Sequence, residues 1–248
     1  MKKTMMAVAA LSATVAMAAD IVSSDIVGYT VKDLSYNTST FCPTFADVQT
    51  GDLDIQGVIP SRKGAEASVG DGDIYFQEMD EDGVGTAVYY YIEGGEQGPG
   101  WYWEEDLEQK SDKVFDFGEG IVLTCNFDDA QFTMSGKVDT ETTSLPLPYN
   151  TSVFGNTRPT TLSLQDIVPS RTGEEASVGD GDIYFQEMDE DGVGTTVYYY
   201  IESGEQGPGW YWEEDLEHKT DKVLGIGESI VMTCNFDDAI FTLPEIGK

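Results

Sequence analysis

The chain has 248 residues and a formal net charge of −33 at pH 7, with 46 acidic side chains against 13 lysines and arginines. A surface this acidic repels nucleic acid and anionic lipid, so both are poor candidates as partners. The charge favours solubility, cation binding or a saline habitat, and charge counting does not separate these three. With 40% hydrophobic and 11% aromatic residues, the chain has the apolar material for a folded core.

The N-terminus has the layout of a secretory signal peptide over residues 1–18. Lys2 and Lys3 precede an apolar run at 5–15, and the Ala-Met-Ala sequence at 16–18 offers the small residues that signal peptidase prefers. A short buried helix is the alternative interpretation. The apolar run is shorter than the ~20 residues that span a bilayer. No other stretch is long enough, so the sequence predicts an exported protein without a transmembrane segment.

Residues 19–31 follow the signal peptide and are rich in β-branched side chains, which predicts an N-terminal strand segment. Its Ile-Val pairs have no equally apolar counterpart later in the chain. We therefore expect this segment to lack a matching strand in the second half of the protein.

A long internal duplication follows, because residues 60–130 recur as residues 169–239 at a constant offset of 109. Among these 71 positions, 60 are identical, and differences fall at 63, 65, 87, 94, 109, 111, 115, 116, 117, 120 and 123. Such self-similarity sets the domain plan. We predict module 1 at 32–137, a linker at 138–148 and module 2 at 149–248.

Within each module, short β-rich runs are separated by turns. In module 1 the runs at 73–79 and 86–92 flank an Asp-Gly turn, a strong hairpin signal. Residues 121–127 alternate apolar and polar side chains with a period of two. About seven such strands per module predict an all-β protein with two tandem antiparallel β-sandwiches, jelly-roll-like or immunoglobulin-like.

With these elements in place, the chain resembles a loosely defined group of small exported bacterial proteins. The matching motifs are Ile-Val-Gly-Tyr at 26–29, Gly-Asp-Ile-Tyr at 72–75, Gly-Trp at 100–101, Gly-Glu-Gly at 118–120 and the segment 132–137. Module 2 departs from the Gly-Glu-Gly motif, because its residues 227–229 are Gly-Glu-Ser. The resemblance implies an exported β-sandwich and no catalytic residues.

An acidic hairpin in each module approximates the start of a calcium loop, in which alternate oxygens converge on the ion. The candidate ligands are Glu78, Asp80 and Asp82 in module 1, and Glu187, Asp189 and Asp191 in module 2. An EF-hand requires a glutamate at the twelfth position of its loop, and the twelfth position counted from Glu78 is Tyr89. The alternatives are a weaker calcium site or an acidic turn that uses Asp-Gly for its backbone geometry.

Aromatic side chains beside carboxylates form a second candidate site, because rings stack on sugar faces and carboxylates accept hydrogen bonds from hydroxyl groups. These residues are Trp101, Tyr102, Trp103, Trp210, Tyr211 and Trp212. Two tryptophans that stand two positions apart share one face of a strand, as core residues do. Core packing is therefore the alternative to a carbohydrate platform.

The chain offers little material for nucleophilic or metal-assisted catalysis. His218 is the only histidine, and Gln109 holds its place in module 1. We therefore predict no catalytic residues and no cofactor other than Ca²⁺ at the acidic hairpins.

Three cysteines allow one disulfide in an exported protein. A bridge between Cys42 and Cys125 would join the opening and late strands of module 1, and Cys234 would then be free or intermolecular. Gly155 stands where a second copy of Cys42 would fall. The alternative is that Cys125 and Cys234 are small buried hydrophobic residues.

Two functions from different classes agree with this sequence. The first is a non-enzymatic structural or interaction protein of the bacterial cell surface or extracellular matrix, which pairs with itself or with other surface proteins and assembles into a layer or filament. In it, residues 21–31 would add to a neighbour's sheet edge. The second is a carbohydrate-binding module for extracellular glycan, with or without calcium. Export places the protein outside the cell, with the periplasm as the alternative.

Overall fold

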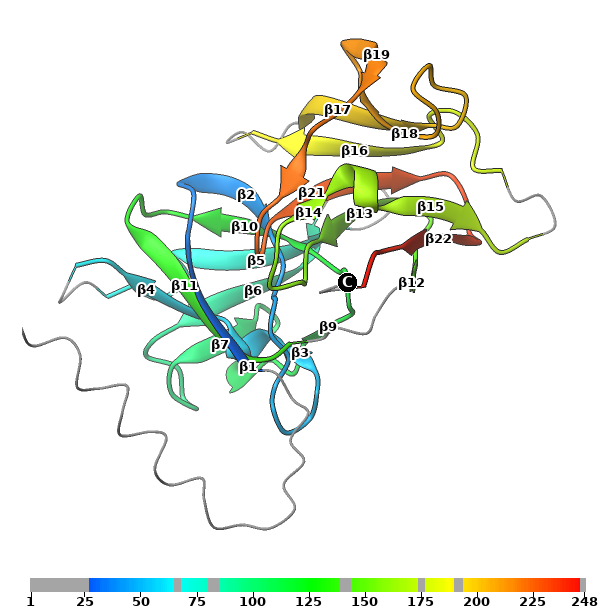
Figure 1. The fold of residues 1–248 in the computed structure, drawn as a ribbon. Coiled ribbons are helices and arrows are strands. Elements are labelled where there is room, and N and C mark those ends of the chain that lie inside the picture. The colour runs from blue at the N-terminus through cyan, green and yellow to red at the C-terminus, as the bar shows by residue number, and fades with distance from the viewer. Residues whose placement is uncertain are drawn as a thin grey trace, which may run out of the picture.

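The structure is a computed structural model. It describes residues 27–64, 68–79, 85–138, 144–173, 177–189 and 194–245. The predicted signal peptide and residues 19–26 of the N-terminal segment lie outside these ranges. The described residues form an all-β protein of antiparallel sheets, which confirms the predicted class (Figure 1). Over the same ranges, no helix has the length and hydropathy needed to cross a bilayer.

Module 1 is built from two antiparallel sheets and a short strand pair. Its elements are β1 (Val27–Asp33), β2 (Asn37–Phe41), β3 (Leu53–Asp54), η1 (Ile55–Gly57), β4 (Ile59–Arg62), β5 (Ile74–Met79), β6 (Gly85–Ile92), β7 (Gly100–Trp103), β8 (Asp106–Lys110), β9 (Val114–Phe115), β10 (Ile121–Cys125) and β11 (Ala130–Lys137). The small sheet has the order β1-β11-β4 and the large sheet has the order β2-β10-β5-β6-β7-β8, while β3 pairs with β9.

Module 2 repeats this arrangement strand for strand. Its elements are β12 (Ser144–Pro146), β13 (Asn150–Gly155), β14 (Leu162–Ser163), η2 (Leu164–Asp166), β15 (Val168–Arg171), β16 (Ile183–Met188), β17 (Gly194–Ile201), β18 (Gly209–Trp212), β19 (Asp215–Lys219), β20 (Val223–Leu224), β21 (Ser229–Cys234) and β22 (Ala239–Thr242). The sheets have the orders β12-β22-β15 and β13-β21-β16-β17-β18-β19. Each sheet of module 1 therefore has a counterpart of identical order.

An aromatic cluster holds the two sheets of each module together. Phe132 on β11 of the small sheet is fully buried, and its ring lies 4.8 Å from Phe41, 5.6 Å from Phe76 and 6.1 Å from Trp101 between centroids. These three residues belong to the large sheet. Aromatic pairs at such distances contribute about 0.5–1.5 kcal/mol each beyond the burial of their area. In module 2, Phe241 holds the position of Phe132.

The N-terminal strand and the predicted linker both belong to the modules. β1 pairs along its whole length with β11 of module 1, from Val27 opposite Lys137 to Asp33 opposite Gln131. β12 lies inside the predicted linker at 138–148 and pairs with β22 in the same position. The linker boundary was therefore wrong, and the N-terminal segment has a counterpart after all, although a shorter and less apolar one.

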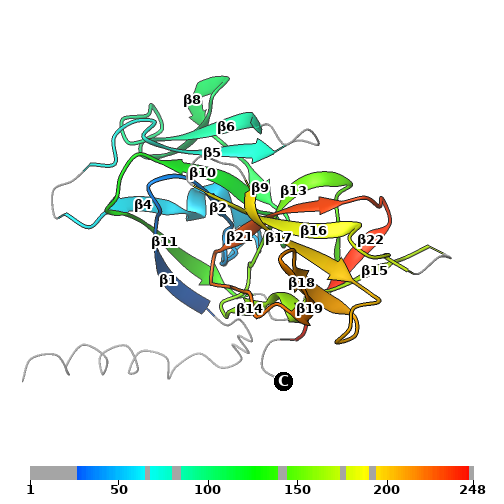
Figure 2. The ribbon, with the colours of Figure 1, turned by 90° about the horizontal axis from the view of Figure 1, so that it is seen from above.

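The modules pack against each other through the outer faces of their large sheets, where β2, β10 and β5 contact β13, β21 and β16 (Figures 1 and 2). The Cys42 N–H donates to the Gly227 carbonyl at 3.3 Å, and the Gly155 N–H donates to the Gly118 carbonyl at 2.8 Å. Cys42 and Gly155 are equivalent positions, as are Gly118 and Gly227. The same surface of each module therefore meets its own counterpart, as in a twofold-symmetric dimer.

The symmetry axis passes close to Cys42 and Gly155. A Cβ atom added to Gly155 would lie 2.2 Å from the Cβ of Cys42 and 2.6 Å from its Sγ. Only one of these two equivalent positions has room for a side chain. The glycine therefore permits the close approach of the two modules.

We expect Gly155→Cys to destabilise the protein by about 1–3 kcal/mol, because two side chains would compete for one space. The double variant Cys42→Gly with Gly155→Cys moves the side chain across the axis without changing composition, so stability should return toward the wild-type value. Urea denaturation of the three proteins measures both effects. A single variant as stable as the wild type, or a double variant no better than the single one, would contradict the symmetric contact.

Candidate functional site

Two related crevices lie along the boundary between the modules. Crevice 1 has a volume of about 840 Å³ and runs between Glu78, Lys113 and Glu119 of module 1 and Leu145 and Phe154 of module 2. It is the larger of the two. Its lining combines charged and apolar side chains, the usual composition of a ligand site.

Crevice 2 is the symmetry-related counterpart, with a volume of about 360 Å³. It runs between Glu187, Lys222 and Glu228 of module 2 and Lys32 and Thr40 of module 1. The pseudo-twofold arrangement of the modules therefore creates two copies of one site.

A third cavity of about 270 Å³ lies on the axis itself. Gln77 and Val122 of module 1 line it together with their counterparts Gln186 and Val231. The equivalent lining from both modules confirms where the axis runs.

A charged cluster forms the floor of crevice 1. The Lys113 Nζ atom lies 2.8 Å from Glu78 Oε1 and 2.8 Å from Glu119 Oε1. The Tyr89 hydroxyl donates to Glu78 Oε1 at 3.0 Å, and Glu119 Oε2 accepts the Asp116 N–H at 2.7 Å. Strands β5 and β6 supply Glu78 and Tyr89, while Glu119 comes from the turn before β10. The site thus joins three separate segments of module 1.

Electrostatics in this cluster favour an ionised lysine and a protonated tyrosine. Burial lowers the pKa of Lys113, but the hydrogen bonds and charges of Glu119 and Glu78 outweigh it and hold that pKa above its ordinary value. Burial, with the adjacent Glu78 carboxylate, raises the pKa of Tyr89 to about 12. Lys113 engages both glutamates, so the arrangement suits recognition of a ligand better than proton transfer.

Crevice 2 has the same cluster with small differences. The Lys222 Nζ atom lies 2.5 Å from Glu187 Oε1, and the Tyr198 hydroxyl donates to the same oxygen at 3.0 Å. Glu228 Oε2 accepts the Gly225 N–H. Burial and the Glu187 charge raise the pKa of Tyr198.

Most of the predicted aromatic site is core. Trp101, Tyr102 and their counterparts Trp210 and Tyr211 are fully buried. The Trp101 Nε1–H donates to the Val58 carbonyl at 2.7 Å, and the Tyr102 hydroxyl donates to the Gly98 carbonyl at 2.7 Å. These four residues cannot contact a glycan, so their prediction as ligand-binding residues was wrong.

Trp103 and Trp212 differ from their neighbours, because each side chain is 39% exposed. Trp103 ends β7, next to the turn at 104–105, and opposes Tyr89 across the sheet. Its position at the strand end explains why it extends past the core although it shares a face with Trp101.

The predicted calcium ligands are only partly described. Asp80, Asp82 and Asp191 lie outside the described residues. Glu78 and Glu187 pair with lysines, and Asp189 follows β16. Among the residues that the structure describes, no three His, Cys, Asp or Glu side chains group closely enough to hold a metal ion. Calcium binding stays a prediction.

The predicted disulfide between Cys42 and Cys125 is absent, because both residues are free and buried. Cys125 pairs with Asn37 at the start of β2, whereas Cys42 follows the other end of that strand. Antiparallel pairing therefore keeps the two thiols a strand length apart. Burial raises the pKa of Cys42 well above its ordinary value, which makes the thiol unreactive.

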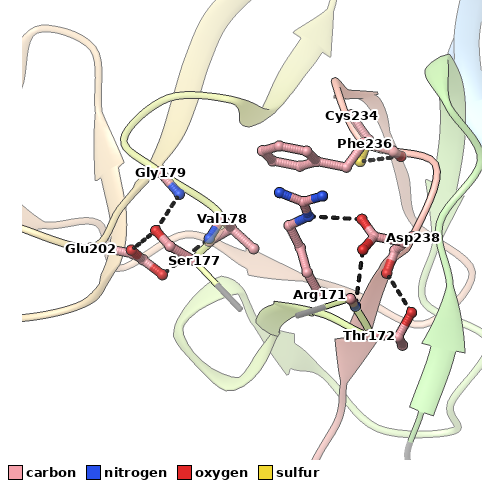
Figure 3. Close-up of polar contacts among 10 residues, drawn as sticks. Arg171, Thr172, Ser177, Val178, Gly179, Glu202, Cys234, Phe236 and Asp238 are labelled. Carbon is pink, nitrogen blue, oxygen red and sulfur yellow. Dashed lines mark hydrogen bonds and ion pairs between the residues drawn. The ribbon is translucent and has the colours of Figure 1, made fainter. Parts of the chain in front are cut away.

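Cys234 is likewise a buried free thiol, which agrees with the alternative interpretation from the sequence. Its Sγ atom lies 3.4 Å from the Phe236 carbonyl (Figure 3). The Arg171 guanidinium stacks over the Phe236 ring at 4.3 Å and bonds Asp238 at 2.7 Å. This arrangement, repeated by Arg62, fixes the turn before the last strand.

The sequence analysis missed the lysine-centred clusters. The available signal was the recurrence of lysine at 113 and 222 in a chain that has so few basic residues. The two partners of Lys113, Glu119 and Glu78, lie 6 and 35 positions away from it, so no local motif contains all three.

Comparison with known proteins gave no match to any protein-family model, curated protein or solved structure. A fold does not by itself define a function. The geometry of the surfaces therefore carries the proposals below.

The pKa of Tyr89 predicts a loss of stability in alkali. Folded Tyr89 keeps its proton to about pH 12, whereas an unfolded tyrosine releases it near pH 10. The unfolded state binds fewer protons in this window, so the free energy of unfolding falls as pH rises. At neutral pH, Tyr89→Phe should lower the free energy of unfolding by about 1–2 kcal/mol. Between pH 10 and 12, the melting temperature of this variant should decline less steeply than that of the wild type. An unchanged slope would contradict the assignment.

Proposed function

We propose that the protein is a non-enzymatic, exported structural or interaction protein that associates with a second copy of itself through the edge strand β1. The signal-peptide pattern supports export to the cell surface or extracellular space. The observation that carries the proposal is the open, apolar edge that β1 presents to solvent.

The backbone of β1 has one free side. The Leu34 N–H donates to the Ala130 carbonyl at 3.0 Å, which fixes the alternation of hydrogen bonds along β1 and β11. Gly28, Thr30 and Lys32 therefore bond to β11, and the backbone groups of the odd-numbered residues face outward. A row of outward groups is a template for pairing with another strand.

The side chains on this edge are unusually apolar for an exposed strand. Val27 is 60% exposed, Tyr29 67% and Val31 42%. All three lie on the outer face of the small sheet. Residue 144 of β12 holds the place of Val31 in module 2, and it is a serine. The apolar edge is thus specific to module 1.

Proline protects the other edges of the small sheets. Pro60 on β4, Pro169 on β15 and Pro146 on β12 stand at positions whose backbone faces away from the central strand. Proline has no N–H to offer a neighbouring strand. Of the four edge strands in these two sheets, only β1 contains no proline.

A second copy fits this edge by symmetry. Antiparallel pairing of β1 with itself about Thr30 places Tyr29 of one copy opposite Val31 of the other, an aromatic and β-branched pair. Lys32 and Lys137 lie in the same sheet, and Lys63 is 2.9 Å from Asp33. This surface is therefore less acidic than the chain as a whole, which reduces repulsion between copies.

We expect the chain without residues 1–18 to dimerise, and both Val31→Pro and Val31→Lys to give monomers. The proline removes an outward N–H without breaking a bond to β11, and the lysine places charge on the apolar edge. Sedimentation velocity over a range of protein concentrations measures the association.

Val168→Lys is the matched control, because Val168 is an exposed valine, 48% accessible, on the proline-protected strand β15. This variant should dimerise like the wild type. The proposal fails if the wild-type chain stays monomeric at every concentration, or if the Val31 variants associate as strongly as the control.

Carbohydrate binding is the second candidate function, and the exposure of Trp103 and Trp212 favours it. Each ring adjoins a turn of acidic side chains that can accept hydrogen bonds from sugar hydroxyls. On a glycan array, Trp103→Ala with Trp212→Ala should abolish a signal that the wild-type protein gives. No wild-type signal, or one that survives the substitutions, rejects this candidate.

A further inference from the structure

The differences between the two modules concentrate in the crevices. Of the 11 differing positions in the duplicated stretch, five are 115, 116, 117, 120 and 123. Each contributes to a crevice lining, either directly or through its counterpart in module 2. The aromatic residues that join the two sheets, by contrast, are the same in both copies: Phe41, Phe76, Trp101 and Phe132 correspond to Phe154, Phe185, Trp210 and Phe241. The two equivalent sites therefore differ in chemistry.

The opposite walls differ as strongly. Residues 145–148, Leu-Pro-Leu-Pro, line crevice 1, and their counterparts 32–35, Lys-Asp-Leu-Ser, line crevice 2. Val153 in crevice 1 likewise corresponds to Thr40 in crevice 2. Crevice 1 is therefore both larger and more apolar.

The charge of crevice 1 remains negative despite its lysine. Lys113, Glu78, Asp116 and Glu119 all line crevice 1, so three carboxylates and one ammonium give a formal charge of −2. Asp116 is exposed at the rim. In crevice 2, Gly225 takes the place of Asp116, which removes that carboxylate.

We propose that crevice 1 binds a cationic amphipathic ligand, with its ammonium or guanidinium group beside Asp116 and Glu119 and its apolar body against Val114, Phe117 and Pro146. Carboxylates at close range attract a cation, particularly where the walls exclude water. Burial of apolar surface adds about 25 cal/mol per Å².

Each crevice has one serine whose hydroxyl is unpaired. Ser152 in crevice 1 and Ser229 in crevice 2 have buried hydroxyl oxygens without a hydrogen-bond partner among the described residues, although buried polar atoms normally have one. The two crevices share this feature, so their charge and apolar lining are what distinguish them.

Fluorescence titration with dansylcadaverine, a primary amine on a naphthalene ring system, tests the proposal. The titration uses the chain without residues 1–18. We expect saturable binding at one site per chain. Asp116→Gly with Phe117→Ile should weaken binding by at least about tenfold. These residues occupy the equivalent positions of module 2, so the substitutions suit this fold, and an unchanged melting temperature checks it.

Ile226→Phe, the mirror-image change in module 2, is the matched control and should leave the affinity unchanged. The anionic naphthalene dye 1-anilinonaphthalene-8-sulfonate should bind at least about tenfold more weakly than the amine. Equal affinity for the two dyes, two equivalent sites per chain, no binding at all, or full binding by the double variant would each overturn the proposal.

Discussion

The architecture depends on the close backbone contact where Cys42 meets Gly155. At this point the two modules approach within the space of a single side chain, and reciprocal hydrogen bonds to Gly118 and Gly227 secure both sides. The contact sets the symmetry axis, and the axis in turn creates the paired crevices and the central cavity. A side chain at residue 155 would separate the modules and widen every space between them.

Local patterns in the sequence predicted the fold class because strands and turns are local structures. The Asp-Gly turn predicted the pairing of β5 with β6, and the alternation of 121–127 predicted β10. The module interface was out of reach, because it joins residues of different modules that no local pattern connects, such as Cys42 with Gly227 and Gly155 with Gly118. The acids that meet Lys113 come from separate strands and turns of module 1, so no local pattern contained them either. Exposure of Trp103 likewise follows from where β7 ends.

The two modules share a core and differ at their boundary. Phe132 and Phe241 close the same aromatic cluster in each copy, so the packing that stabilises each sandwich tolerates little change. The exposed residues of the crevice walls, such as Asp116, carry no such constraint. Duplication therefore supplied two scaffolds of the same strand order, and substitutions at the boundary changed the surfaces between them while the aromatic cluster stayed the same.

The prolines on the edge strands, Pro60, Pro146 and Pro169, limit the size of any assembly that forms through the small sheets. A strand ribbon grows without end only when each member offers two open edges, one to receive and one to extend. In the dimer proposed above, the single open edge of each chain is used in the first pairing, which has twofold rotational symmetry. Such a pair would be closed, so this route would not extend into a fibre.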